Sequence, residues 1–244
     1  MNLIKTLKTG IFGLLTIFFL VHCSDNSYLQ DGGTSNPHYD GTVLDYLNSR
    51  PDYFTKLVEI IHLTGMEDVF TDSTITFFAP TDYSIDKSLT FLNSYLYHAG
   101  NDTVSDLSQI SADVWKNYLT LYLIHDKYLL KDIPQMDTTA MNVYGGQAYV
   151  SYNGRPMNIG VVYHDENGVK YAGYRQLFYS YIYDFTTNDL INAHVATSDI
   201  QPTNGVVHVL RFYDHYFGFN VNNFYNDAVS AGIKNKDGET NNDD

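Results

Sequence analysis

Histidine and acidic side chains form short groups along this chain, and such groups can bind metals or transfer protons. His164, Asp165 and Glu166 are consecutive, and Asp214 precedes His215. Neither group has the H-E-x-x-H spacing of a zinc site, and the sequence contains no G-x-S-x-G nucleophile elbow and no phosphate-binding glycine loop. We therefore expect no catalytic residues, no bound metal and no cofactor.

Tyrosine offers a different chemistry, because the sequence has 22 tyrosines. Tyr179, Tyr181 and Tyr183 alternate along one β-rich segment. Alternate residues of a strand share one face, so these three rings could stack on sugar rings or on a protein partner. The alternative is that this face packs beneath helices and only its hydroxyl groups reach the rim. The sequence is compatible with both interpretations.

The overall charge limits the partners of the chain. Its 14 lysines and arginines stand against 28 acidic residues, which gives a formal net charge of -14. Binding to nucleic acid needs a basic surface that neutralises phosphates, so we expect no nucleic-acid partner. With 244 residues, 44% of them hydrophobic, the chain is long and apolar enough to fold around its own core.

The first 22 residues have the composition of an export signal. Lys5 and Lys8 precede an apolar run over residues 11–21, and this run is about half of the ~20 residues that a membrane-spanning helix needs. We therefore interpret residues 1–22 as a signal peptide. Cys23 follows directly and is the only cysteine, so the chain forms no internal disulfide and no multi-cysteine metal site.

The residues around Cys23 point to a membrane anchor. Leu20-Val21-His22-Cys23 resembles the lipobox of bacterial lipoproteins, although His22 stands where a small residue is usual. The resemblance implies that Cys23 becomes a lipidated N-terminus; the alternative is a secreted protein that loses Cys23 with its signal peptide. The mature chain would carry 12 basic and 28 acidic residues, so acyl chains rather than charge would hold it at the membrane.

The residues after the cysteine indicate how the protein is presented. Residues 23–39 are expected to be a lipid-anchored flexible tether, because they are rich in Gly, Ser, Asn and Asp. Ser24-Asp25 resembles the surface-export signal of Bacteroidota lipoproteins. This resemblance implies a location at the outer membrane of a Gram-negative cell, exposed on the surface.

Periodicity separates a helical first half from a stranded second half. Leu44 and Leu47 indicate a short helix that Pro51 ends, and Asp52 is expected to cap a second helix that ends at Gly65. Beyond residue 141 the apolar period becomes two, and Asn-Gly pairs at 153–154, 167–168 and 204–205 indicate turns. This order of elements predicts an α+β fold.

A further helix is expected to begin at Ser111. Its apolar stripe is predicted to include Val114, Tyr118, Leu121, Tyr122 and His125. In the stranded half, His208 alternates with apolar residues. We therefore expect His125 and His208 to be core histidines, each with one satisfied hydrogen bond, rather than ligands or bases.

Two segments carry more information than periodicity alone. The first, residues 74–82, is a β-rich run, Thr-Ile-Thr-Phe-Phe-Ala-Pro-Thr-Asp, that Pro80 ends and after which the Thr81 hydroxyl is expected to cap a helix. In the second, residues 199–210, a turn containing Asn204 and Gly205 leads into a strand.

Together these segments resemble the two sequence blocks of the fasciclin (FAS1) domain family. The residues that carry the resemblance, and that we expect to be structural, are Thr76, Phe78, Ala79, Pro80, Thr81, His125, Thr203, Asn204, Gly205 and His208. The resemblance implies a twisted β-sandwich or wedge flanked by helices, a role in adhesion and no enzymatic activity. In animal members, integrin recognition has been ascribed to short Asp-Ile segments and to a Tyr-His segment, and here Asp199-Ile200, Asp132-Ile133 and His125 occupy comparable places.

These observations give a domain plan and two functional hypotheses. After the tether we expect a fasciclin-like domain at residues 40–216, a C-terminal extension at 217–233 and a disordered tail at 234–244. The favoured function is non-catalytic adhesion or binding of an extracellular macromolecule, with Asp199 and Ile200 among the candidate contacts. The alternative is a glycan-binding accessory lipoprotein of a polysaccharide-uptake system that uses the tyrosine face. The sequence indicates no oligomeric state.

Overall fold

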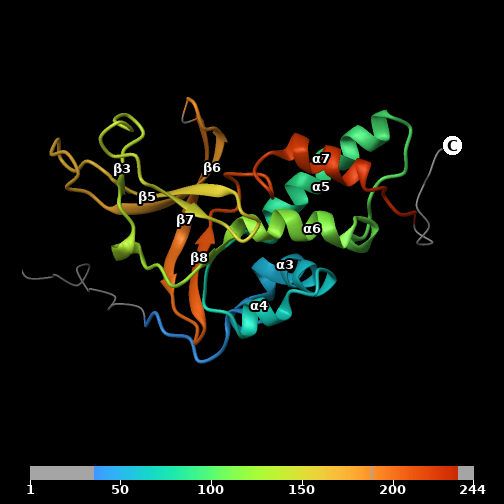
Figure 1. The fold of residues 1–244 in the computed structure, drawn as a ribbon, viewed down its shortest axis with the longest axis horizontal. Helices are drawn as coiled ribbons and strands as arrows, with labels where there is room; N and C mark the ends of the chain where they lie inside the picture. The colour runs from blue at the N-terminus through green and yellow to red at the C-terminus, as the bar shows by residue number, and fades with distance from the viewer. Residues whose placement is uncertain (1–35, 188, 236–244) are drawn as a thin grey trace, which may run out of the picture. The chain divides into compact units, whose positions relative to one another are not determined.

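The computed structural model describes residues 36–187 and 189–235. Cys23, the expected site of lipid attachment, and most of the predicted tether lie outside these residues. The helices are α2 (Val43–Asn48), α3 (Pro51–Leu63), α4 (Glu67–Thr71), α5 (Asp82–His98), α6 (Ala112–Leu119) and α7 (Val221–Ser230). The strands are β1 (Ile75–Ala79), β2 (Leu123–His125), β3 (Gln135–Met136), β4 (Gln147–Val150), β5 (Pro156–Tyr163), β6 (Arg175–Asp184), β7 (Asp189–Ile200) and β8 (Gly205–Leu210). Short 3-10 turns cover Leu107–Gln109, Thr120–Tyr122 and Leu130–Asp132. Helices and a mixed sheet occur together (Figure 1), which confirms the predicted α+β class.

The starts of the first helices follow from local chemistry. Thr42 caps α2 through a capping box, because its hydroxyl accepts from the Asp45 amide and the Asp45 carboxylate accepts from the Thr42 amide. The short first helix ends at Asn48, ahead of Pro51 as predicted, but the predicted cap of the second helix is wrong. Pro51 is the first residue of α3, where its missing N–H costs nothing, and Arg50 rather than Asp52 is the N-cap.

Strand β1 ends and α5 begins at the predicted places, but the cap differs. Pro80 follows β1 directly, and Thr81 is the N-cap residue of α5. The Thr81 hydroxyl makes no capping bond and is buried without a partner among the described residues. Its carbonyl instead accepts from the Ser84 hydroxyl at 2.8 Å. The predicted hydroxyl cap is therefore wrong, although the predicted helix start is confirmed.

The two sequence blocks lie side by side in one sheet. The strand order is β2-β1-β8-β7-β6-β5-β3, with β4 pairing to β5. Strands β1 and β8 are parallel neighbours, and Phe77 lies opposite Val207. Segments separated by more than 120 residues thus lie side by side in one sheet, as the resemblance implies.

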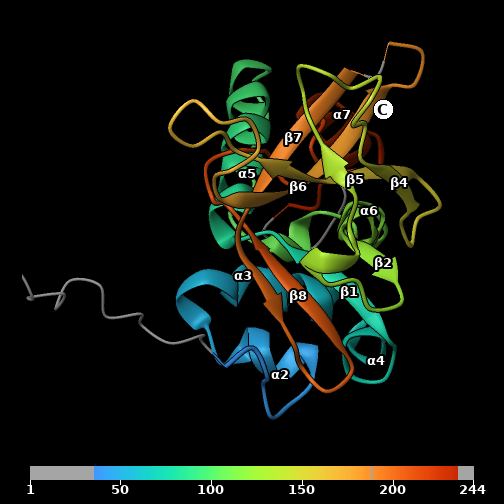
Figure 2. The ribbon, with the colours of Figure 1, turned by 90° about the vertical axis from the view of Figure 1, so that its left-hand side faces the viewer.

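Strand β7 connects two parts of this sheet. Its first half pairs with β6, where Phe178 lies opposite His194. Its second half pairs with β8, where Val195 lies opposite Leu210 and the register then shifts. Figure 2 shows β6 and β8 running in clearly different directions on either side of β7. The sheet is therefore curled rather than flat.

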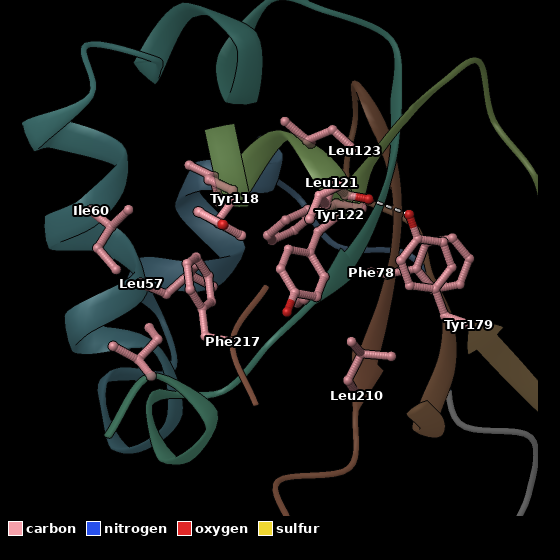
Figure 3. Close-up of a cluster of buried hydrophobic side chains, with 14 of the residues drawn as sticks. Leu57, Ile60, Phe78, Tyr118, Leu121, Tyr122, Leu123, Tyr179, Leu210 and Phe217 are labelled. Atoms are coloured by element: carbon pink, nitrogen blue, oxygen red, sulfur yellow. Dashed lines mark hydrogen bonds between the residues drawn. The ribbon is translucent and has the colours of Figure 1, made fainter. Parts of the chain in front are cut away.

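The core lies between this sheet and the helices α3, α5, α6 and α7 (Figures 1 and 3). Its largest fully buried side chains include Trp115, Tyr122, Tyr179, Phe54, Phe70, Phe77, Phe78, Phe217 and Phe224. Burial of each aromatic side chain stabilises the fold by about 1.5–3 kcal/mol. Two of these rings, Phe217 and Phe224, come from the predicted C-terminal extension. The extension is thus part of the domain core.

Two predicted boundaries need correction. Residues 37–39, assigned to the flexible tether, are held beside Gln201, since the Gln201 amide donates to the Pro37 carbonyl at 2.7 Å and the Tyr39 amide donates to the Gln201 carbonyl at 3.0 Å. Lys234, assigned to the disordered tail, is paired through its backbone with Gln109 at 2.9 Å in both directions. Hydrogen bonds to their backbone groups hold both segments, and the Tyr39 ring also packs against the core.

The predicted stripe from Ser111 to His125 does not form one helix. Helix α6 ends at Leu119, a 3-10 turn follows, and His125 is the last residue of strand β2. The His125 side chain is exposed, and its ring stacks on Tyr152 at a centroid distance of 4.0 Å. The predicted core position of His125 is therefore wrong, because the helical period was extended six residues beyond the helix.

Candidate functional site

The predicted tyrosine face is not an open surface. Tyr179 is fully buried and Tyr181 is 6% exposed, whereas Tyr183 is 56% exposed. The ring of Tyr179 stacks on Phe78 at 4.0 Å, and its hydroxyl donates to the Leu121 carbonyl (Figure 3). The candidate binding role of Tyr179 and Tyr181 is therefore wrong. Their face packs against the core, as the alternative interpretation held, and only Tyr183 is accessible.

Asp199 lies at a corner built by two loops and the buried His208. The Asp199 amide donates to His208 Nδ1 at 3.2 Å, and the Asp199 carboxylate accepts from the Leu130 amide at 2.8 Å. Because Nδ1 is an acceptor, the neutral ring carries its proton on Nε2, which donates to the Tyr128 carbonyl at 3.0 Å. His208 is 0% exposed, so the prediction of a core histidine is confirmed, with two hydrogen bonds instead of one.

Burial lowers the pKa of His208 from its usual value, while the hydrogen bond to Tyr128 and the charge of Asp199 act in the opposite direction. The neutral ring is the form that accepts the Asp199 amide hydrogen. His208 thus serves as a fixed link between the 126–132 loop and the 199–205 loop, and it is not exposed to act as an acid or base.

Thr76 holds the same loop from strand β1. Its hydroxyl donates to the Asp126 carbonyl at 2.8 Å and accepts from the Tyr128 amide at 2.8 Å. Asp126 has a φ of 70° and Asp199 a φ of 61°, in the left-handed region that Asp tolerates better than most residues. Buried side chains of both sequence blocks therefore fix the backbone of both loops.

Asn204 and Gly205 join this corner to the helices. The Asn204 side chain accepts from the Val43 amide at 2.8 Å and donates to the Phe70 and Ser73 carbonyls. A Cβ atom at Gly205 would lie 2.5 Å from the Ile75 carbonyl oxygen. Gly205 is thus required by close backbone approach, which the predicted turn did not indicate.

A groove of about 520 Å³ opens beside this corner. We call it the corner groove, and it is lined by residues from the segments 38–40, 127–132 and 201–206. Lys127 donates to the Thr203 carbonyl at 3.0 Å and so bridges two of the lining segments. Lys131 and Asp132 are exposed beside it, and the Asp132 carboxylate also accepts from the Leu129 amide at 3.0 Å.

The structure brings together some of the predicted contacts and separates others. Asp132 lines the corner groove, and Asp199 anchors the loop behind it. Ile133 is buried, and Ile200 is half-buried, facing the core cluster. Ile133 and Ile200 are therefore packing residues, although the Asp-Ile segments lie at the expected place.

Sequence reasoning missed the two lysines of the groove, Lys127 and Lys131. A signal was present, since both lie within five residues of Asp132 in a chain with 14 basic residues. The described residues include no group of three or more His, Cys, Asp or Glu side chains placed to hold a metal ion. Within the same residues, no helix is long and apolar enough to cross a membrane. Ammonium, carboxylate and amide groups at an open groove suit binding by hydrogen bonds and charge.

Comparison with known proteins finds a match over the region that contains these residues. Residues 52–211, more than half of the chain, match the family model of the fasciclin domain, and this region includes both sequence blocks. Among solved structures, the chain is similar to a FAS1 domain pair from the insect cell adhesion molecule fasciclin I, with 19% sequence identity and a TM-score of 0.45. The similarity covers 70% of this chain and 49% of that chain, so this chain spans about half the length of the domain pair. No curated protein matches the sequence.

Proposed function

This chain belongs to the fasciclin domain family, and we propose from this premise that it is a non-catalytic protein that binds an extracellular macromolecule through the corner groove. Fasciclin domains are known in cell-adhesion proteins, and the domain pair described above comes from one of them. That this chain binds a partner, that the partner is an extracellular macromolecule and that the corner groove is the site are our proposals, which go beyond membership of the family.

One observation supports the groove as the binding site. It is lined partly by the second family block, and the 126–132 loop beside it is held by the buried side chains of Thr76 from the first block and His208 from the second. Loops fixed in this way lose little conformational entropy when a partner binds, so binding energy is kept for the contacts themselves. Lys131 and Asp132 are two of the exposed charges of the groove that a protein partner would pair with.

The test is attachment of cells or coated beads that display the full chain. Lys131→Glu reverses a charge at the groove rim, and Lys116→Glu makes the same change at an exposed position on α6. We expect Lys131→Glu to lower attachment at least about threefold and Lys116→Glu to leave it unchanged, because a rim charge mainly changes the association rate. Equal attachment of both variants and the parent chain would refute the assignment of the corner groove as the binding site.

We also propose that the mature protein is anchored at the outer membrane by lipid on Cys23 and faces the outside of the cell. The support is the order of Lys5, Lys8, the apolar run and Cys23 in the sequence. Labelled palmitate should be incorporated into the parent chain and lost in Cys23→Ala; retention of label in the variant would refute lipidation. Protease treatment of intact cells should remove the domain, and protection from protease would place it on the periplasmic side instead.

A further inference from the structure

A second groove opens where β7 changes partners. Strand β7 pairs with β6 as far as Phe178 opposite His194, and from Val195 it pairs with β8. The first residues of β6 remain with β5 and diverge from β7, as Figure 2 shows for the two strands. This divergence groove has a volume of about 340 Å³, and its lining includes Arg175, Gln176, Ser198 and Arg211.

The divergence groove is cationic in an acidic protein. Arg175 and Arg211 are two of the four arginines of the chain. The guanidinium of Arg175 lies over the Tyr163 ring at 4.7 Å, and that of Arg211 lies over the Tyr213 ring at 5.7 Å. In the part of the chain that the structure describes, neither guanidinium forms an ion pair with a carboxylate. Both are therefore oriented by aromatic rings while their hydrogen-bond donors remain available to a ligand.

The nearest acidic side chain along the sequence is already engaged. Asp214 accepts from the His194 amide at 3.1 Å and lies 2.7 Å from His194 Nδ1, and its side chain is 11% exposed. Asp214 is thus engaged by His194, and it is not among the residues that line the groove. The residues that line the groove include Arg175, Gln176, Ser198 and Arg211, and their side chains carry hydrogen-bond donors that suit an anionic ligand.

A row of aromatic rings continues from this groove over helix α5. Phe212 and Tyr213 directly follow Arg211 and are about half exposed, at 50% and 53%. The Phe212 ring contacts Tyr83 at 5.4 Å, and the row then follows α5. We call it the aromatic strip, and it consists of Tyr83, Phe91, Tyr95, Phe212, Tyr213 and Tyr216.

Three rings of the aromatic strip are arranged in a line along α5. Tyr83, Phe91 and Tyr95 lie at intervals of eight and four residues on one helix, so they follow an i, i+4 stripe that turns by about 120° over about 18 Å of helix length. Lys87 fills the remaining position of this stripe and lies over the Tyr216 ring at 4.2 Å. The strip therefore adds a third cation along its length. A linear row of rings with cations suits an extended polymer better than the broad patch that a globular partner buries.

From this arrangement we infer that the divergence groove and the aromatic strip together bind an acidic polysaccharide. Arg175 and Arg211 hold a sugar carboxylate by paired N–H···O bonds, and the rings of the strip stack on the apolar faces of neighbouring sugars while the tyrosine hydroxyls bond sugar hydroxyls. This inference rests on the proposed binding role of the domain but not on the corner groove. Four of its rings, those of Tyr83, Tyr95, Phe212 and Tyr213, are exposed, in contrast to Tyr179 and Tyr181.

The test is isothermal titration of the full chain with oligogalacturonate, a linear polymer of uronic acid, and with its methyl ester, which keeps the sugar rings and removes the charge. We expect the acid to bind at least about tenfold more tightly than the ester. The double variant Arg175→Gln, Arg211→Gln should lose this preference, and Phe212→Ala should weaken binding of both polymers at least about threefold. Lys116→Gln on α6 and Tyr53→Ala on α3, both at exposed positions, are the matched controls and should bind as the parent does.

Several outcomes would overturn the inference. These are no binding of oligogalacturonate, equal affinity for acid and ester, or full binding by the double arginine variant with an unchanged circular dichroism spectrum. Tighter binding of a sulfated glycan would overturn the carboxylate assignment, and preference for a single-stranded oligonucleotide would overturn the polymer class. Because Lys131→Glu lies in the corner groove, its effect on attachment is measured independently, and either proposal can fail while the other stands.

Discussion

The buried histidines His208 and His215 give the protein a pH dependence at the scale of single residues. Both rings are enclosed, and burial lowers the pKa of His208 and lowers that of His215 to about 3, with the nearby Asp214 charge opposing the shift of His215. The Tyr122 hydroxyl accepts from the Gly218 amide at 2.8 Å and donates to His215 Nε2 at 3.1 Å, which also requires the neutral ring.

The sign of the effect follows from proton binding. Between the lowered folded pKa and the unfolded value of about 6.5, the unfolded chain binds more protons, so stability is full above pH 6.5 and falls as the pH falls. Between pH 6 and 5 the free energy of unfolding should decrease with a slope approaching about 1.4 kcal/mol per pH unit for His215, and the lowered pKa of His208 adds to the slope with the same sign. Urea titrations over this range should show it.

The quantity to compare between variants is the slope of the unfolding free energy against pH and not the absolute stability. His215→Gln should reduce the slope by about one proton and His208→Gln should also reduce it, whereas His98→Gln, at an exposed position ending α5, should leave it unchanged. A slope that is the same in all three variants and in the parent chain would contradict the assignment of two buried neutral histidines.

Asn204 carries a second residue-scale prediction. Its side chain satisfies one backbone amide, of Val43 in α2, and two backbone carbonyls, of Phe70 in α4 and of Ser73 in the turn before β1. Asn204→Ala leaves these groups without partners in a partly buried site, so we expect a loss of about 1–3 kcal/mol in the free energy of unfolding. Asn222→Ala on the exposed side of α7 is the control, and a loss no larger than that of the control would argue against this bridging role.

Some residues can be placed from the sequence and others cannot, and the difference depends on whether a local sequence pattern determines their position. The alternation around His208 and the Pro80 stop reflect strand geometry, and both predictions agree with the structure. Alternation also put Tyr179 and Tyr181 on one face, but the period of a strand does not tell which face is covered. His125 was misplaced because α6 stops at Leu119 without a glycine or proline to mark its end.

At the scale of elements, α7 is the part of the fold that sequence reasoning undervalued. The family model ends at residue 211, and α7 lies beyond it. Its Phe224 is fully buried and contacts the rings of Trp115 at 5.3 Å and Tyr118 at 5.2 Å. Tyr118 also donates to the Asp227 carboxylate of α7 at 2.6 Å. The helix therefore closes the core from the side of α6.

This packing predicts a large cost for a change in α7. Phe224→Ala removes a ring from a site enclosed by other rings, so we expect the free energy of unfolding to fall by about 3–5 kcal/mol. Val229→Ala, at a position of the same helix that is 41% exposed, should cost less than about 1 kcal/mol. Guanidinium titrations of both variants decide the matter, and a similar small cost for both would show that α7 is an appendage rather than part of the core.

At the same scale, the grooves depend on pairings that a local pattern does not contain. The corner groove needs β1 and β8 side by side, and the two sequence blocks were sufficient to predict that pairing. The divergence groove arises because β7 leaves β6 near His194, and nothing in the period of the strand marks this position. Arg175 and Arg211, 36 residues apart, therefore meet for a reason that only the sheet topology shows.

At the scale of the molecule, one strand connects the two parts of the sheet, and one core spans both. Rings from the helical side and from β6 are in contact, since Phe219 lies near Tyr122 at 5.4 Å and near Tyr181 at 5.8 Å. The core cluster likewise includes side chains from Val43 to Ala228. Because β7 cannot separate from β6 without losing its position against β8, the two parts of the sheet are expected to unfold together.

The single tryptophan allows this expectation to be tested. Trp115 is fully buried in the helical layer, and its indole N–H donates to the Leu107 carbonyl at 2.9 Å, so its fluorescence reports on the helices. Far-ultraviolet circular dichroism reports on helices and sheet together. We expect the two signals to give one urea midpoint and one slope, because a chain with a shared core unfolds in a single transition. A tryptophan midpoint below the circular dichroism midpoint would mean that the helical layer opens while β5, β6 and β7 remain paired, and β7 would then be a hinge between two cooperative units.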